Sequence, residues 1–189
     1  DDFNINVNNI KNAITTKTKV IMPVDIGGWP CDYDAIMTLV NQKEITSLFK
    51  PDGNVQEQLA RILVISDAAH SIGATYKGSI TGTSTDITVF SLHSVKNITT
   101  GEGGAICINL PKPFDNKNVL QYLRYLSLNG QTKSAFEKSK VGGWRYDIVD
   151  QGLKVNMPDI CAAVGLAQIK QYKNKLLPER KDIFNYYSN

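Results

Sequence analysis

Three short apolar runs, each followed by polar residues, constrain the fold of this chain more than any other feature. The runs are ILVIS at 62–66, ITVF at 87–90 and AICIN at 105–109. Each has the length of a strand and is rich in β-branched residues, as expected for strands buried in a sheet. A fourth run, KVIMPV at 19–24, predicts another strand. The four runs alternate with longer connections, which predicts an α/β fold with a mixed, mainly parallel sheet flanked by helices.

Helices are predicted in several of the connections. Asp32 is a suitable N-cap for a helix over 33–43, and a second helix is predicted over about 115–128. Pro158 fits the first turn of a third helix that reaches about residue 172. Three apolar residues of this third helix are expected to face inward: Ile160, Val164 and Ile169.

Composition narrows the class of protein. The apolar share of 42% and charged share of 21% are ordinary for a globular domain, and 189 residues normally make one domain. The formal charge of +3 is spread along the chain, so nothing favours a nucleic-acid partner. Cys31, Cys107 and Cys161 are widely spaced, which argues against a disulfide framework and against a metal site. The apolar runs are too short to span a membrane, and the polar start is unlike a signal peptide, so a cytoplasmic location is expected.

Polar side chains follow two of the predicted strands where each strand ends. Asp67 follows one run, and Ser91 and Lys96 follow the next. The carboxyl ends of strands in an open α/β sheet form the crevice that binds ligands. A lysine near glycines, with an acid on a neighbouring strand, fits pyridoxal phosphate (PLP), because the amine can form a Schiff base and the carboxylate can pair with the protonated ring nitrogen. Taken alone, the spacing leaves a solvated loop lysine as the alternative interpretation of Lys96.

Longer motifs around these residues carry more information. The chain contains DAAHSIG, FSLHSVKN and TTGEGG, in this order, between residues 67 and 104. These motifs resemble the nucleotide-sugar aminotransferase family (the DegT/StrS family), whose members are PLP-dependent enzymes of fold type I. Further stretches resemble other landmarks of that family, so that the resemblance runs along nearly the whole chain: VDIGGWPCDYDAI at 24–36, LSLNGQTKSAF at 126–136 and GLKVNMPDICAAVGLAQI at 152–169.

The resemblance implies a role for five residues. Lys96 corresponds to the Schiff-base lysine, which also moves protons during the reaction, and Asp67 to the acid that pairs with the ring nitrogen. Both are therefore expected to be catalytic and to bind the cofactor. His70 is expected beside the 3′-oxygen of PLP and Ser91 at its phosphate. Asn156 resembles an Asn that family members extend across a dimer interface to the phosphate of the partner's PLP.

Each of these residues also has a structural interpretation. Asp67 could cap a helix that begins at the next residue, and His70 could be a core histidine with satisfied hydrogen bonds. Ser91 could carry a merely structural hydroxyl, and Asn156 could cap the helix that follows it. The Gly-rich TTGEGG segment is expected to be architectural, because its backbone must turn tightly or pass close to another group.

The resemblance also implies a reaction. The expected activity is transfer of an amino group, with glutamate as the donor, to a nucleotide-linked keto-deoxysugar in the biosynthesis of cell-surface polysaccharide or glycan precursors. A homodimer with shared active sites is expected. One alternative is a PLP- or PMP-dependent sugar dehydratase, although those enzymes typically replace the Schiff-base lysine, which is present here as Lys96. Another alternative is a truncated, non-catalytic homologue.

Domain organisation follows from the same resemblance. Family chains are about twice as long as this one, and the matching landmarks belong to the middle of such a chain. Residues 1–175 are expected to form part of the PLP-binding large domain. Residues 176–189 are expected to begin the helix that leads to a small C-terminal domain.

Overall fold

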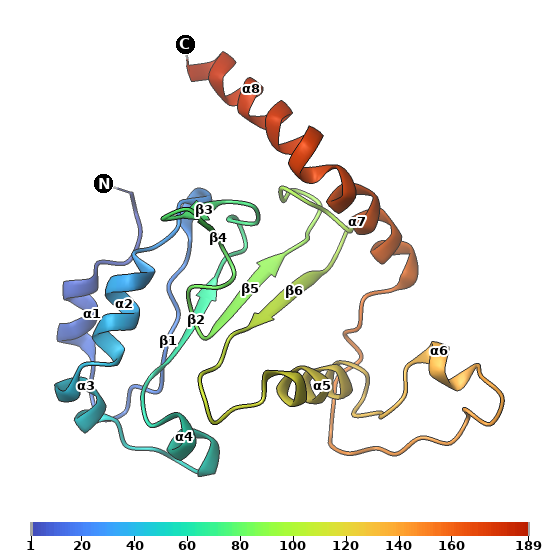
Figure 1. The fold of residues 1–189 in the computed structure, drawn as a ribbon, viewed down its shortest axis with the longest axis horizontal. Coiled ribbons are helices and arrows are strands. Elements are labelled where there is room, and N and C mark those ends of the chain that lie inside the picture. Colours follow the sequence, from blue (N-terminus) through green and yellow to red (C-terminus); the bar gives the residue numbers. More distant parts are fainter. Residues whose placement is uncertain (1, 189) are drawn as a thin grey trace. The chain divides into compact units, whose positions relative to one another are not determined.

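The computed structural model describes residues 2–188, without the side chain of Ala135, as two compact units. The first unit holds the residues up to Pro113 and those from Asp159 onward, and the second holds Phe114–Pro158. Figure 1 shows the chain as a ribbon coloured along the sequence.

A four-stranded sheet forms the centre of the first unit, in the order β1-β2-β5-β6. The strands are β1 (Val20–Ile21), β2 (Leu63–Asp67), β5 (Ile87–Ser91) and β6 (Gly104–Ile108). Strands β1, β2 and β5 run parallel, and β6 pairs with β5 in the antiparallel direction. A small antiparallel hairpin of β3 (Thr75–Tyr76) and β4 (Ser79–Ile80) lies apart from this sheet. The predicted mixed, mainly parallel sheet is therefore confirmed.

The first unit contains six α-helices among its described residues. Their bounds are α1 (Val7–Ala13), α2 (Tyr33–Val40), α3 (Lys43–Leu48), α4 (Asn54–Leu59), α7 (Asp159–Gln171) and α8 (Leu177–Ser188), with a 3₁₀ turn η1 (Ile26–Gly28) and a π-helical segment η2 (Tyr172–Leu176). Asp32 caps α2 as predicted, because its side chain accepts a hydrogen bond from the Ala35 amide. The predicted helix over 33–43 is divided, since Gln42 has extended backbone dihedrals and a new helix starts at Lys43.

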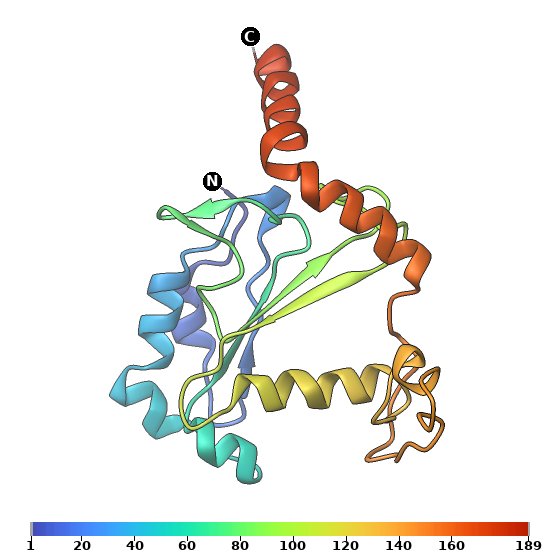
Figure 2. The same ribbon diagram turned by 45° about the vertical axis from the view of Figure 1, so that its right-hand side comes forward.

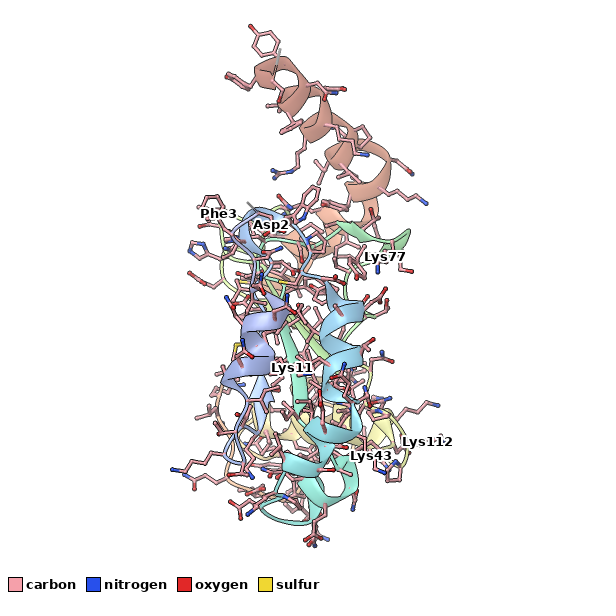
Figure 3. The ribbon with its side chains drawn as sticks, turned by 90° about the vertical axis from the view of Figure 1, so that its left-hand side faces the viewer. Asp2, Phe3, Lys11, Lys43, Lys77 and Lys112 are labelled. Carbon is pink, nitrogen blue, oxygen red and sulfur yellow. The ribbon has the colours of Figure 1, made fainter. Side chains whose placement is uncertain are left out.

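One face of the sheet carries the hydrophobic core. Figure 3, viewed from the side of α1, α2 and α3, shows these helices in front of the strands, with Lys11 and Lys43 on their outer surface. Behind them the core is formed by fully buried aliphatic residues of helix and strand alike, among them Ile36, Val40 and Val64. Removing a side chain of this kind from water contributes about 1.5 to 3 kcal/mol each, so this face holds the helices to the sheet.

A buried ion pair fixes the amino ends of the strands. The Arg61 guanidinium contacts both carboxylate oxygens of Asp86 at 2.7 Å. The Val64 amide donates to the same carboxylate at 2.9 Å, so that β2 and the start of β5 are tied together. Both side chains are almost fully buried, and each charge compensates the other.

The opposite face of the sheet is open in the first unit. Apolar side chains on this face are partly exposed. The exposed fraction is 59% for Met22, which follows β1, 37% for Val89 on β5 and 51% for Ile106 on β6. Alternation along each strand puts these residues on the side away from α1–α3. Strand register also puts Asp67 on this open face, because it is opposite Val89 on the neighbouring strand.

Helix α7 does not bury the residues that its sequence suggested. Ile160, Val164 and Ile169 are 82%, 45% and 57% exposed, so the prediction that they face inward is wrong for the described structure. Apolar residues lie all round this helix, so periodicity could not select one face. Gly165 is the buried residue of α7, and it faces the Thr100 side chain.

The second unit is built on α5 (Asn116–Ser127), which confirms the helix predicted over 115–128. Asp115 caps it by accepting a hydrogen bond from the Lys117 amide at 2.9 Å. A short helix, α6 (Ala135–Lys138), follows, and isolated bridges pair Leu128 with Lys154 and Gln131 with Ile148.

Candidate active site

Strand register brings the first two predicted site residues to the same face of the sheet. Asp67, the last residue of β2, is opposite Val89 of the parallel strand β5. Ser91 ends β5 two residues further on, and side chains two apart on a strand point the same way. Asp67 and Ser91 are both half-buried and stand at the carboxyl ends of neighbouring strands. These ends border the open face described above.

The backbone of Asp67 is held firmly. Its amide donates to the Pro23 carbonyl at 2.9 Å, and its carbonyl accepts from the Asp25 amide at 3.0 Å. The carboxylate accepts a hydrogen bond from the Ala69 amide at 3.1 Å. A turn follows Asp67, so the helix that it was suggested to cap does not form. No cation pairs with this carboxylate among residues 2–188.

His70 lies in the turn after Asp67 and is exposed, which excludes a core histidine. Its carbonyl accepts a hydrogen bond from the Asn97 side chain at 3.4 Å, and Asn97 is the neighbour of Lys96. The same carbonyl lies against Gly28, where a Cβ would come within 2.7 Å of the oxygen. Gly28 also has a φ of +87°, so glycine is required there. The His70 turn is thus packed between η1 and the Lys96 loop.

Lys96 lies in the loop that joins β5 to β6. The ends of this loop are closed by hydrogen bonds from the Leu92 amide to the Gly103 carbonyl and from the Thr100 amide to the Leu92 carbonyl, both 2.9 Å. The Lys96 amide donates to the His93 carbonyl at 3.0 Å. The side chain of Lys96 is half-buried, and its amine forms no ion pair or hydrogen bond within the described part of the chain.

The glycines of TTGEGG have the expected architectural role. Gly104 pairs with Ser91 at the start of β6, and a Cβ at Gly104 would lie 2.9 Å from the Phe90 carbonyl oxygen. The Thr100 hydroxyl donates to the Glu102 carbonyl at 2.8 Å, which closes the tight turn. Gly104 therefore allows β6 to approach β5 directly beside Ser91.

Two side chains that the motifs did not point to hold the site from α7 and η2. The Gln168 amide group donates to the Thr99 carbonyl at 2.6 Å and accepts from the Thr99 amide at 3.1 Å. The Tyr172 hydroxyl donates to the Ile72 carbonyl at 2.9 Å, two residues beyond His70. Figures 1 and 2 both show α7 running past the loop between β5 and β6. The loop of Lys96 and the turn of His70 are thus held by one helical segment.

We expect Gln168→Ala to loosen the Lys96 loop, because the Thr99 amide and carbonyl both lose their partner. The cost should be about 1 to 2 kcal/mol of local stability, the range of two hydrogen bonds that are partly replaced by water. Hydrogen exchange at the Thr99 amide measures it, and exchange should accelerate about tenfold. Gln171→Ala is the matched control on the same helix, since the Gln171 side chain bonds only within α7. Equal exchange in both variants would contradict the role given to Gln168.

Asn156 belongs to the second unit. It is exposed, and its side-chain oxygen accepts a hydrogen bond from the Lys154 amine at 2.6 Å. The two residues form an exposed polar pair on the segment that precedes α7.

A cavity of about 560 Å³ lies beside η1. Its lining includes Trp29, Tyr76 and Lys77, but none of the predicted site residues. The Tyr76 hydroxyl donates to Asp32, and this hydrogen bond lowers the pKa of the Asp32 carboxyl. Lys77 forms an ion pair with Asp34, so the polar groups around this cavity are already paired with one another.

Comparison with known proteins identifies the class to which this fold and site belong. The model of the DegT/DnrJ/EryC1/StrS aminotransferase family matches residues 1–49 and 56–189. The chain therefore belongs to this aminotransferase family, which confirms the resemblance seen in its motifs.

Two curated relatives cover almost the whole chain. An uncharacterised protein of Methanocaldococcus jannaschii, MJ1066, is 37% identical over 183 residues, which are 96% of this chain and 41% of the relative. The spore coat polysaccharide biosynthesis protein SpsC of Bacillus subtilis is 33% identical over 190 residues, which are 99% of this chain and 43% of SpsC. The chain thus spans less than half the length of the curated relatives it matches.

Among solved structures, the chain is similar to Spr1654 of Streptococcus pneumoniae, a candidate sugar aminotransferase. Its PMP form is 42% identical with a TM-score of 0.87, over 98% of this chain and 46% of Spr1654. The PLP form is 39% identical with a TM-score of 0.86. This similarity confirms the predicted fold class. In residues 2–188, none of the helices has the length and apolar character needed to cross a bilayer.

Proposed function

We propose that the protein containing this chain is a PLP-dependent sugar aminotransferase. The observation that carries the proposal is the strand register, which aligns the Asp67 carboxylate and the Ser91 hydroxyl on one open face of the sheet. The loop that begins at the end of β5 then supplies the unpaired amine of Lys96.

The chemistry of these groups fits PLP. The half-buried Asp67 carboxylate lacks a cationic partner in the described chain, and a protonated ring nitrogen would supply one. The Ser91 oxygen accepts a hydrogen bond from the His93 amide at 3.3 Å, which leaves its O–H free to donate to a phosphate oxygen. The partial exposure of Val89 and Ile106 supports access of a flat ring to this face.

Each residue then has a definite task. Asp67 holds a proton on the ring nitrogen by its negative charge, and His70 donates or accepts a hydrogen bond at the ring hydroxyl. Lys96 would hold the cofactor covalently, and its amine, once displaced by the amino donor, would carry the proton that the substrate carbon loses. When bound, PLP supplies an electron sink for the carbon that loses its proton. Orientation of the reactants by the rigid strand ends contributes the rest of the rate acceleration.

The proposed acceptor is a nucleotide-linked keto-deoxysugar, and the proposed amino donor is glutamate. The names of Spr1654, a candidate sugar aminotransferase, and of SpsC, a spore coat polysaccharide biosynthesis protein, support a sugar acceptor and a role in polysaccharide precursor synthesis. The location that we propose for the protein is the cytoplasm.

A panel of nucleotide-linked ketosugars tests this function. The complete protein, loaded with PLP, is mixed with glutamate and each sugar in turn, and 2-oxoglutarate and aminosugar are measured by mass spectrometry. Equimolar formation of both products with one or more sugars is expected. Loss of water from a sugar without consumption of glutamate would instead indicate a dehydratase. No reaction with any member of the panel, by protein that binds PLP, would contradict the proposal.

We further propose that Asn156 acts in the active site of a second copy of the chain. The exposed pair of Lys154 and Asn156 presents an amine and an amide, both able to donate hydrogen bonds to a phosphate. A closed two-fold dimer gives two copies of such a residue equivalent places in two sites.

Mixing two variants tests this arrangement. Asn156→Ala should lose about tenfold in PLP affinity, the value of a hydrogen bond to a charged group, and Lys96→Ala should be inactive. Dimers formed from one chain of each kind contain one site with both residues intact. Activity of the mixture is therefore expected to exceed the average of the two separate variants several-fold. Activity equal to that average would show that Asn156 serves only its own chain.

The domain division is also a proposal. Residues 1–175 would form part of the PLP-binding large domain, and residues 176–189 would begin the connection to a small C-terminal domain. The π-helical segment η2 (Tyr172–Leu176) supports a boundary here, because the helical geometry changes between α7 and α8.

A further inference from the structure

A second carboxylate, Asp25, is completely buried beneath the site. Asp25 lies four residues after the end of β1, next to Val24, and it is 0% exposed. Its neighbour Val24 bridges to Asp67 in parallel register, so Val24 and Asp67 point to the open face. Asp25 therefore points to the covered face, directly behind the strand end that carries Asp67.

Three donors satisfy this carboxylate. The Tyr33 hydroxyl and the Ser71 hydroxyl donate to one oxygen at 2.5 and 2.6 Å. The Cys31 amide donates to the other oxygen at 3.0 Å. The Tyr33 hydroxyl also contacts the Ser66 hydroxyl at 2.9 Å, next to Asp67. The Asp25 side chain thus connects the end of β1 with the start of α2 and the turn of His70, and the Tyr33 hydroxyl extends this network to strand β2.

None of these partners is a cation. Burial, together with the hydrogen bond to Asp25, raises the pKa of Tyr33 far above its ordinary value, so Tyr33 remains a neutral donor. Burial and the Asp25 charge raise the pKa of the Cys31 thiol to about 12. Among residues 2–188 no ion pair involves Asp25, in contrast to Asp86, whose charge is matched by Arg61. The Asp25 carboxylate is therefore surrounded by neutral donors alone.

We propose that Asp25 is a positioning residue of the active site, which fixes the Asp67 strand end and the His70 turn and adds a buried negative charge behind them. This inference rests on the proposed PLP chemistry. Asp25 has no counter-cation among residues 2–188 and lies behind the acid that must hold a ring proton, so its carboxylate can favour that proton as well as fix the strand end. A negative charge nearby favours any cationic group bound on the other side of the strand.

Asp25→Asn tests the proposal in the complete protein, because Asn has nearly the same shape but no charge. Two readouts are expected to change. PLP affinity, measured by fluorescence titration, should fall about tenfold, because the Asp67 strand end and the His70 turn are fixed less well and a nearby negative charge is lost. The pH midpoint of the absorbance change of the bound cofactor should move down by about half a unit or more, because a nearby negative charge no longer favours the protonated form.

Asp86→Asn is the matched control. Asp86 is equally buried but lies at the amino ends of the strands, paired with Arg61, so this change should lower thermal stability without moving the midpoint. Tyr33→Phe removes the hydrogen bonds of the Tyr33 hydroxyl to Asp25 and Ser66 and leaves the Asp25 carboxylate, so it should weaken PLP binding and keep the midpoint. The proposal would be overturned if Asp25→Asn and Asp86→Asn had the same PLP affinity and the same pH midpoint of the cofactor absorbance change.

Two further measurements cover the remaining outcomes. If the wild-type protein does not bind PLP, the proposed function is wrong. Hydrogen exchange of the apo protein then tests the positioning role of Asp25 independently of the cofactor. Exchange at the Ser71 amide, which donates to the Ala68 carbonyl, should then be faster in Asp25→Asn than in Asp86→Asn. Equal exchange would overturn the positioning role. If Asp25→Asn does not fold, Ser71→Ala replaces it, and unchanged PLP affinity and unchanged exchange in that variant would contradict the proposal.

Discussion

Lys96→Ala is expected to abolish covalent capture of PLP and to lower the rate of amino transfer on the order of ten-thousandfold, about 5 to 6 kcal/mol in the barrier. The reason is that one amine has two tasks, holding the cofactor and moving the proton, and no other group in the Lys96 loop can do both. Borohydride reduction of the PLP-loaded complete protein, followed by peptide mapping, locates the bond. The pyridoxyl mass should be found on the peptide that contains Lys96.

Lys43→Ala is the control for this experiment. Lys43 is exposed on the outer surface formed by α1, α2 and α3, on the opposite side of the core from the open face (Figure 3). Its loss should change neither labelling nor rate. A pyridoxyl label on any lysine other than Lys96, or labelling that persists in Lys96→Ala at the wild-type level, would remove Lys96 from the proposed role.

Asp67→Asn is expected to retain part of the PLP affinity and to lose about a hundredfold in rate, about 3 kcal/mol in the barrier. The fold should survive, because an amide oxygen can still accept the hydrogen bond from the Ala69 amide that the carboxylate accepts now. An amide has no charge, so it cannot keep the ring nitrogen protonated, and the electron sink is weakened.

Two measurements separate this effect from a folding defect. Thermal unfolding of the apo variant should match the wild type within about 1 kcal/mol, because only one charge has changed on a half-buried group. Asp52→Asn, in the exposed loop before α4, provides a variant with the same chemical change and no expected effect on rate. Turnover of Asp67→Asn close to the wild-type value would show that Asp67 does not hold the ring proton.

Local sequence signals were sufficient for the four-stranded sheet and for placing two candidate site residues at its strand ends. The apolar run at 87–90 predicted β5 almost to the residue, and a polar residue after each run placed Asp67 and Ser91 at strand ends. Such signals are local, because the spacing of apolar side chains and the turn residues that follow them can be read within a few positions of the sequence. The motifs around Asp67 and Lys96 gave the family, which the family comparison confirmed.

Long-range packing decided the rest. Asp25 was part of a motif without an assigned role, and only the fold showed that Ser71, 46 residues away, donates to it in a buried network. Gln168 reaches Thr99 across 69 residues, and no local pattern distinguishes it from the exposed Gln171 on the same helix. A residue's burial and its partners depend on which elements pack together, and this is set by the free energy of the whole tertiary structure. The sequence by itself therefore determined the strands and the family and indicated the candidate reactive groups, whereas only the tertiary structure showed which residues hold those groups in place.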